Sequence, residues 1–260
     1  MICSTAPADS DSLLAATLRF DYMARLSALI REMQSAYEHT QAVEILQEAT
    51  LRMGAEASIF ASFIREGKTS ISYRLLLACD PARLAEHERP HGDDLDPWLT
   101  YAQKHSEPVR SSEIPMVGDA ARATVELAQR FGFRSAVIVP APSGGGLSRT
   151  GVLCLGSSRP GYFDDEGYVT LKVVARGVAM ELHEWWLGRL RDELIATTGI
   201  TATDLALLNQ ESLGHTTKTI ARLLGLSTSS VDSRFQRLNI KLGVANRKAA
   251  AHLAAEYGLI

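Results

Sequence analysis

The sequence predicts two domains: an N-terminal α/β/α sandwich with a mostly antiparallel sheet, and a C-terminal all-α domain of four helices. Two observations favour this division. Between residues 14 and 194, amphipathic helical segments alternate with pairs of short apolar strands. From residue 200 to residue 260, the apolar residues follow helical spacing only, and glycines separate the segments. We therefore expect an α/β domain over 14–194, a linker over 195–199 and a helical domain over 200–260.

The α/β domain is expected to alternate helices with strand hairpins. Amphipathic spacing predicts the helices, and short runs rich in Ile, Phe, Tyr, Leu and Val between turn residues predict the hairpins. Thr40 is the expected N-cap of the second helix. In chain order the expected elements are a helix over 18–35, a helix over 40–53, a hairpin of 57–64 with 70–79, a helix over 96–105, a helix over 120–131, a hairpin of 135–141 with 150–156, and a long helix over 169–194.

The composition is typical of a globular protein. Of the 260 residues, 46% are hydrophobic and 22% are charged, and no run of about 18 apolar residues exists to span a bilayer. The segment 1–12 lacks the basic and apolar regions of a secretory signal. The cysteines, odd in number and far apart, fit neither a disulfide framework nor a zinc site. We expect a cytoplasmic protein with reduced thiols and with no cofactor, metal or membrane partner.

The net charge of −3 conceals a difference between the two domains. Residues 197–260 carry seven Lys and Arg against four Asp and Glu, a net charge of +3, whereas the rest carries 20 against 26, a net charge of −6. A modest basic domain attached to an acidic one is expected where only one part of a protein approaches phosphates.

From residue 200 onward the sequence has the pattern of a helix-turn-helix. Gly214 ends a first helix, and a second helix precedes the turn Gly225-Leu226-Ser227. Ser227 is placed to cap a third helix, whose first turn then points outward. Small hydroxyl side chains permit close approach to a major groove, and arginine can bond a guanine edge or a phosphate. The residues expected to contact DNA are Lys218, Thr228, Ser229, Ser230, Asp232, Ser233, Arg234, Arg237, Lys241 and Arg247.

Further residues at fixed spacing in this domain carry a family resemblance. They are Ile220-Ala221, Leu226-Ser227, Val231, Lys241-Leu242-Gly243-Val244, Asn246-Arg247, Ala249-Ala250 and Gly258-Leu259-Ile260. Across about 60 residues without a gap, the domain resembles the DNA-binding domain of LuxR-type transcription regulators. The resemblance implies four helices, the third in the major groove and the fourth, over 247–257, in dimerisation. It also implies a palindromic site on double-stranded DNA, read by a homodimer with half-sites about one helical turn apart.

Three residues depart from the LuxR-type pattern. Thr219 stands where the family usually has Glu. Asp204 occupies the position of the acidic residue that opens the family pattern, and Asp232 takes a position that is commonly Lys or Asn. A carboxylate on the third helix repels phosphate, so affinity is expected to be lower, or base preference is altered toward a cytosine amine. Alternatively, Asp232 pairs with Arg234 or Arg237 on its own helix.

The N-terminal domain carries a second resemblance. Its residues Asp96-Pro97, Phe131-Gly132, Ser135, Val139-Pro140 and Gly151-Val152-Leu153 are similar, in order and spacing, to the autoinducer-binding domain that usually precedes this DNA-binding domain. The resemblance implies that Asp96 accepts a hydrogen bond from the amide of an acyl-homoserine lactone. It also implies that nearby tryptophan and tyrosine side chains donate to the carbonyl groups of that ligand.

Those donors are absent from the matching positions. The family's tryptophan falls at about Arg83, its tyrosine at about His87 and its second tryptophan at Ser111, while one of its glycines falls at Ala136. A pocket without these donors leaves buried ligand carbonyls unpaired, so the usual lactones should bind weakly. We therefore expect either a different ligand or none.

The residues over 151–156, with Pro160, Phe163 and the helix to Leu182, are also similar to a GAF-type sensor domain, an architecture with varied ligands. The candidate ligand contacts of the sensor domain are Tyr73, Asp96, Trp98, Ser135 and Cys154. Core packing explains each of these side chains at least as well as ligand contact does.

The run His87-Glu88-Arg89-Pro90-His91 has the spacing of a zinc-binding HExxH motif. Two histidines at that spacing bind one zinc ion only if they share a helix face. Pro90 opposes this arrangement, because its ring clashes with the preceding turn and restricts its neighbour. A solvated loop is the better interpretation, and a metal-dependent hydrolase is the weaker alternative.

The sequence therefore predicts a dimeric transcription regulator with no catalytic step. An N-terminal sensor domain, responding to a small-molecule signal, would control the C-terminal helix-turn-helix by shifting the population of DNA-competent dimers. A ligand-independent regulator of the same type is the first alternative. A protein-interaction module with an idle basic face is another.

Overall fold

The computed structural model describes residues 12–66, 70–79, 96–143 and 149–260, and the side chains of these residues other than 64–66 and 70–73. The chain divides into two compact units, one that includes the described residues up to Trp185 and one that includes Trp186–Ile260. The expected linker falls within a helix, because α7 runs from Tyr168 to Thr198 and gives way to Gly199. The hydroxyl of Thr198 supports this last turn by donating to the carbonyl of Leu194 (2.6 Å).

A five-stranded antiparallel sheet in the order β2-β1-β5-β4-β3 forms the centre of the first unit. Its strands are β1 (Ala57–Glu66), β2 (Ser70–Ala78), β3 (Val109–Arg110), β4 (Ser135–Pro142) and β5 (Thr150–Ser157). Both expected hairpins are present. β3 was not predicted, because two residues are too few to show a strand pattern.

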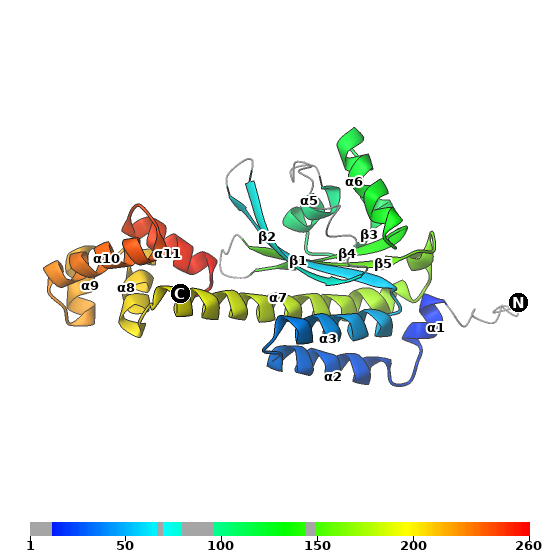
Figure 1. Ribbon diagram of the computed structural model, residues 1–260, viewed down its shortest axis with the longest axis horizontal. Coiled ribbons are helices and arrows are strands. Elements are labelled where there is room, and N and C mark those ends of the chain that lie inside the picture. Colours follow the sequence, from blue (N-terminus) through cyan, green and yellow to red (C-terminus); the bar gives the residue numbers. More distant parts are fainter. Residues whose placement is uncertain (1–11, 67–69, 80–95, 144–148) are drawn as a thin grey trace, which may run out of the picture. The chain divides into compact units, whose positions relative to one another are not determined.

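Helices cover both faces of the sheet, as expected for an α/β/α sandwich. Figure 1 shows α2 (Tyr22–Ser35), α3 (His39–Arg52) and α7 on one face, and α5 (Pro97–Lys104) and α6 (Asp119–Arg130) on the other. The first helix was expected over 18–35, but α2 begins only at Tyr22. A short α1 (Leu13–Thr17) precedes it, and residues 18–21 connect the two helices. Thr40 is not the cap of α3, which already begins at His39 after Glu38.

The two sheet faces differ in chemistry because successive strand residues point to opposite sides. The face toward α5 and α6 is apolar. The face toward α3 and α7 includes polar pairs, such as the buried hydrogen bond between Thr50 Oγ1 and Ser58 Oγ (2.6 Å). On this side Trp185 also joins α7 to the end of α2, since its indole nitrogen donates to the carbonyl of Ala36 (2.8 Å).

Four helices form the helix-turn-helix part of the second unit: α8 (Ala202–Ser212), α9 (Thr217–Leu224), α10 (Thr228–Leu242) and α11 (Arg247–Glu256). Each begins with a polar side chain that accepts a hydrogen bond from a free backbone amide of the first turn. Gly225 ends α9 in the left-handed conformation (φ +65°), which an L side chain rarely adopts. The core comprises Ile200, Leu207, Leu208, Ile220, Ala221, Val231, Phe235, Leu238, Ala250, Ala251 and Ala254. The predicted all-α architecture is confirmed.

Within the described part of the chain, none of the helices combines the length and the apolar character that a membrane span requires.

Candidate nucleic-acid interface and sensor core

The start of α10 is organised by one serine, as the sequence predicts. Ser227 Oγ accepts a hydrogen bond from the amide of Ser230 (3.1 Å) and lies 2.8 Å from the hydroxyl of the same residue. Thr228, Ser229 and Ser230 are exposed around this cap. Their short side chains leave the first turn of α10 open to a large partner.

The body of α10 has a buried face and an opposite exposed face that is mostly polar. Val231, Phe235 and Leu238 point into the helical core, one helical turn apart. The positions on the opposite side, about half a turn away, are exposed. They are Ser229, Ser233, Gln236, Arg237 and Ile240. Gln236 was not among the predicted contacts, although the helical spacing from Ser229 and Ser233 already places it on this face.

Two cations predicted to contact DNA, Arg234 and Lys241, form ion pairs at the flank of α10 against α8. Arg234 Nη1 is 3.9 Å from Asp204 Oδ1, and Lys241 Nζ is 3.7 Å from Asp204 Oδ2. Lys241 also donates to the carbonyl of Gly199 (2.8 Å). Asp204 is mostly buried, so its charge requires compensation. Arg234 and Lys241 are therefore held by contacts within the helical domain, with Asp204 and, for Lys241, with the carbonyl of Gly199.

Arg247, also predicted to contact DNA, joins three other helices. Its Nε lies 3.2 Å from Oε2 of the buried Glu211 on α8, and its Nη1 donates to Thr217 Oγ1 on α9 (2.8 Å). Its guanidinium carbon lies 5.9 Å from the centre of the Phe235 ring on α10. Thr217 Oγ1 in turn donates to Oδ1 of the exposed Asp232 (3.5 Å). Asp232 therefore bonds to α9, while no ion pair with Arg234 or Arg237 is present among the described residues.

The remaining cations of the helical domain are on its surface. Lys218, Arg222, Arg237 and Lys248 are exposed and form no ion pair within the described part of the chain. They come from α9, α10 and α11. Of the predicted basic contacts, Lys218 and Arg237 keep the free charge that a phosphate needs.

The apolar face of the sheet packs against α5 in a cluster that we call the α5-side core. Its buried members are Ala57, Ala61, Phe63, Trp98, Ala102, Ile114, Phe133, Ala136, Ile138, Val152 and Cys154. The rings of Trp98 and Phe133 lie 6.2 Å apart at an angle of 41°. Two of the predicted ligand contacts, Trp98 and Cys154, meet in this core.

Trp98 brings an unsatisfied donor into the α5-side core. Its side chain is buried, with 7% of the residue surface exposed, and its Nε1 has no hydrogen-bond partner among the residues that the structure describes. An unpaired buried donor costs about 1 to 3 kcal/mol. Such a group is a candidate contact for the acceptor of a bound molecule.

Asp96 has a structural role at the start of α5. Its Oδ1 accepts hydrogen bonds from the amides of Trp98 (2.8 Å) and Leu99 (3.2 Å), and Pro97 occupies the first helical position. The Asp-Pro pair is thus an N-cap, which a carboxylate stabilises at the positive end of a helix. The cap fixes the position of Trp98, two residues later.

Ser135 lies away from the α5-side core, whereas Tyr73 stands at the register position opposite Phe63, a member of that core. Ser135 begins β4 one position before Ala136, so it lies on the opposite face, where its hydroxyl accepts from the amide of Phe163 (3.5 Å). Tyr73 pairs with Phe63 through the backbone of β2, and its side chain lies outside the described residues.

The remaining positions are those where this chain lacks the tryptophan, tyrosine and glycine residues of the family pattern. Ser111 Oγ accepts a hydrogen bond from the amide of the fully buried Ala136 (3.2 Å), so these two positions are in contact. Arg83 and the run 87–91, with its HExxH spacing, lie outside the described residues. Elsewhere in the chain, where side chains are described, no group of three or more potential metal ligands converges.

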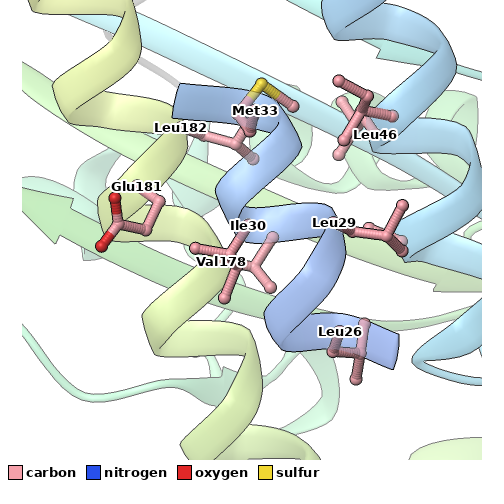
Figure 2. Close-up of a pocket in the computed structure, with 10 residues that line it drawn as sticks. Leu26, Leu29, Ile30, Met33, Leu46, Val178, Glu181 and Leu182 are labelled. Carbon is pink, nitrogen blue, oxygen red and sulfur yellow. The ribbon is translucent and has the colours of Figure 1, made fainter. Parts of the chain in front are cut away.

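A small pocket lies on the other side of the sheet, between α2, α3 and α7. Its lining includes Leu26, Leu29 and Ile30 of α2 and Val178 and Leu182 of α7, and Figure 2 shows Ile30 beside Val178. The enclosed space is about 10 Å³, which holds about one water molecule. No predicted ligand contact lines it.

A buried histidine joins α7 to the two ends of the β4–β5 turn. His183 Nε2 lies 2.7 Å from Ser143 Oγ, which donates its proton to the carbonyl of Arg149 (2.5 Å). His183 therefore donates through Nε2, while its buried Nδ1 has no hydrogen-bond partner within the described ranges of the chain. Burial, together with the charge of Arg149, lowers the pKa of His183 to about 4. A Cβ on Gly151 would lie 2.7 Å from Nδ1, which explains glycine at this position.

The fold resembles solved structures of two regulators. Escherichia coli SdiA matches with a TM-score of 0.65 and 17% identity over 92% of this chain and 99% of that chain. A second SdiA structure, a complex with octanoyl-rac-glycerol, matches with a TM-score of 0.66 and 16% identity over 92% and 96%. The N-acylhomoserine lactone dependent LuxR family factor CepR2 from Burkholderia cenocepacia matches with a TM-score of 0.55 and 16% identity over 65% and 98%.

No curated protein matches the sequence. The model of the autoinducer binding domain, in contrast, matches residues 38–183, more than half of the chain. This range begins at α3 and ends in α7, so it includes the whole sheet and the α5-side core. The chain therefore belongs to the autoinducer-binding domain family, with a fold shared with SdiA over nine-tenths of its length.

Proposed function

We propose that this protein is a cytoplasmic, homodimeric transcription regulator that binds double-stranded DNA through α10. We further propose that its autoinducer-binding domain responds to a small molecule other than the usual acyl-homoserine lactones. The observation that carries the first part is the exposed polar face of α10, which begins at the Ser227 cap and includes Ser229, Ser233 and Arg237.

The surface of the helical domain supports DNA as the partner. A B-DNA major groove admits one α-helix, and short hydroxyl side chains let the backbone of that helix approach the bases. Lys218, Arg222, Arg237 and Lys248 supply free positive charge from three different helices. Two copies of such a domain on a palindromic site would place two α10 helices about one DNA turn apart.

The α5-side core supports a ligand that is largely apolar. Its buried members are apolar and include four alanines together with the aromatic rings of Phe63, Trp98 and Phe133. Trp98 Nε1 offers one hydrogen bond, whereas the carboxylate of Asp96 already caps α5. A neutral amphiphile with an oxygen acceptor fits this chemistry better than a ligand that needs several donors. SdiA in complex with octanoyl-rac-glycerol is a precedent within the shared fold.

DNA binding is tested with the purified full-length chain and random duplex DNA. We expect retardation at low ionic strength, with an affinity that falls steeply as salt rises, because phosphate contacts release counterions. We also expect two protein chains per palindromic site. Failure to retard any duplex at low salt would exclude DNA as the partner.

Ligand binding is tested by thermal unfolding of the full-length chain with octanoyl-rac-glycerol, with an acyl-homoserine lactone and with neither. A ligand at free concentration c that binds the folded state stabilises it by RT ln(1 + c/Kd), so Tm rises with the logarithm of the ligand concentration once that concentration exceeds Kd. We expect the acylglycerol to raise Tm more than the lactone. If neither compound moves Tm while DNA binding is intact, the ligand-independent regulator is the better description.

A further inference from the structure

Gln236 occupies the centre of the exposed face of α10. It is one residue after the buried Phe235 and three residues after the exposed Ser233, so it points away from the helical core. Its amide has no hydrogen-bond partner within the described part of the chain, and the side chain is exposed. The amide is therefore available to a partner that approaches this face.

The neighbouring side chains leave Gln236 as the long neutral group on this surface. Ser229 and Ser233 are too short to reach far beyond the helix, and Arg234 is directed to Asp204 on α8 (3.9 Å). A glutamine side chain carries one acceptor and two donors in a plane. This set matches the N6 donor and N7 acceptor of adenine in the major groove, which glutamine reads with two parallel hydrogen bonds.

We propose that Gln236 is a base-reading residue that sets a preference for adenine at one position of each half-site, and that Arg234 reads no base. This inference rests on the proposed DNA-binding function. The charge pattern of the sequence alone would favour Arg234 over Gln236 as the residue that reads a base, so the proposal reverses that order.

The test is a selection of bound duplexes from a random DNA library, with the full-length chain and its variants at low ionic strength. Wild type is expected to enrich a symmetric motif with an A·T pair at one position of each half-site. Gln236→Ala should keep the rest of the motif and lose the base preference at that position, with binding weakened about 5- to 150-fold for each half-site. Gln236→Glu should replace adenine by cytosine there, since a carboxylate accepts from cytosine N4.

Two control variants separate base reading from effects on folding. Asn209→Ala changes an exposed amide on α8, and Arg234→Ala removes a cation that contacts Asp204; both should select the wild-type motif. Circular dichroism checks that each variant is folded. A Gln236→Ala protein that selects the unchanged motif overturns the inference alone. A wild-type protein that enriches no motif overturns the proposed DNA readout as well.

Discussion

Glu211 Oε2 on α8 lies 3.2 Å from Arg247 Nε on α11, and only 4% of the glutamate side chain is exposed. The contact is an ion pair without hydrogen-bond geometry, since no described residue forms a hydrogen bond with this oxygen. The same arginine bonds Thr217 on α9 and lies over the ring of Phe235 on α10. One partly exposed cation therefore holds the four helices of the domain together.

We predict that Arg247→Met destabilises the helical domain by about 3 kcal/mol, because it leaves a buried carboxylate uncompensated. Urea denaturation followed by circular dichroism measures the loss. Lys248→Met, at the exposed next position, is the matched control and should change the unfolding free energy by less than about 0.5 kcal/mol. The double variant Glu211→Gln with Arg247→Met should recover part of the loss. If Arg247→Met and the double variant lose the same unfolding free energy, Arg247 does not act by compensating the charge of Glu211.

Arg237→Ala and Arg234→Ala are expected to differ in their effect on DNA binding. Arg237 is exposed with a free charge, so its loss should lower the salt dependence of the affinity, the slope of log K against log salt, by about 1 for each subunit. Arg234 faces Asp204, so its loss should leave the slope unchanged and cost about 1 kcal/mol of stability. Retardation of random duplex DNA over a range of salt concentrations gives both slopes. Equal slopes for the two variants would count against this assignment.

His183 is expected to make the protein less stable in mild acid. Its pKa is about 4 when folded and about 6.5 when exposed, so the unfolded chain binds more protons between these values. Stability is therefore complete above about pH 6.5 and decreases as the pH falls toward 4. The expected loss between pH 7.5 and pH 5 is about 2 kcal/mol, measured by urea denaturation at both values.

His183→Gln is the control for the acid effect, because glutamine does not titrate and can still donate to Ser143. The variant should lose about 2 kcal/mol less than wild type between the two pH values, whatever its stability at pH 7.5. A pH dependence that is the same in wild type and variant would assign the acid sensitivity to other groups.

Trp98→Phe separates ligand contact from core packing. The substitution removes a buried N–H that has no partner in the described part of the chain, so the loss of packing is partly offset and the unfolding free energy should change by less than about 1 kcal/mol. The rise in Tm produced by octanoyl-rac-glycerol should decrease. Trp185→Phe is the matched control, since it removes an N–H that donates to Ala36 and should destabilise the protein without affecting the ligand response. An unchanged ligand response in Trp98→Phe would show that this donor is not used.

The sequence alone determined the order of the two main hairpins, of the longer helices and of the helix-turn-helix, although it missed the short α1 and β3. Hydrophobic periodicity and local capping act over a few residues, so they are readable without tertiary contacts. The cap at Ser227 and the left-handed Gly225 are of this kind, and the structure confirms both. The cap at Thr40 was predicted wrongly, because neighbouring polar residues compete for the same position and the sequence does not say which one adopts the extended conformation.

Only the tertiary structure decided which charged and polar groups remain free. Arg234, Arg237 and Lys241 share one helix and a similar chemistry, yet Asp204 on another helix engages two of them and leaves Arg237 in solvent. Likewise Ser135 and Trp98 were equivalent candidates until the sheet placed them on opposite faces. Ion pairs and burial depend on residues far apart in the chain, so a one-dimensional pattern identifies the type of surface but not its available atoms.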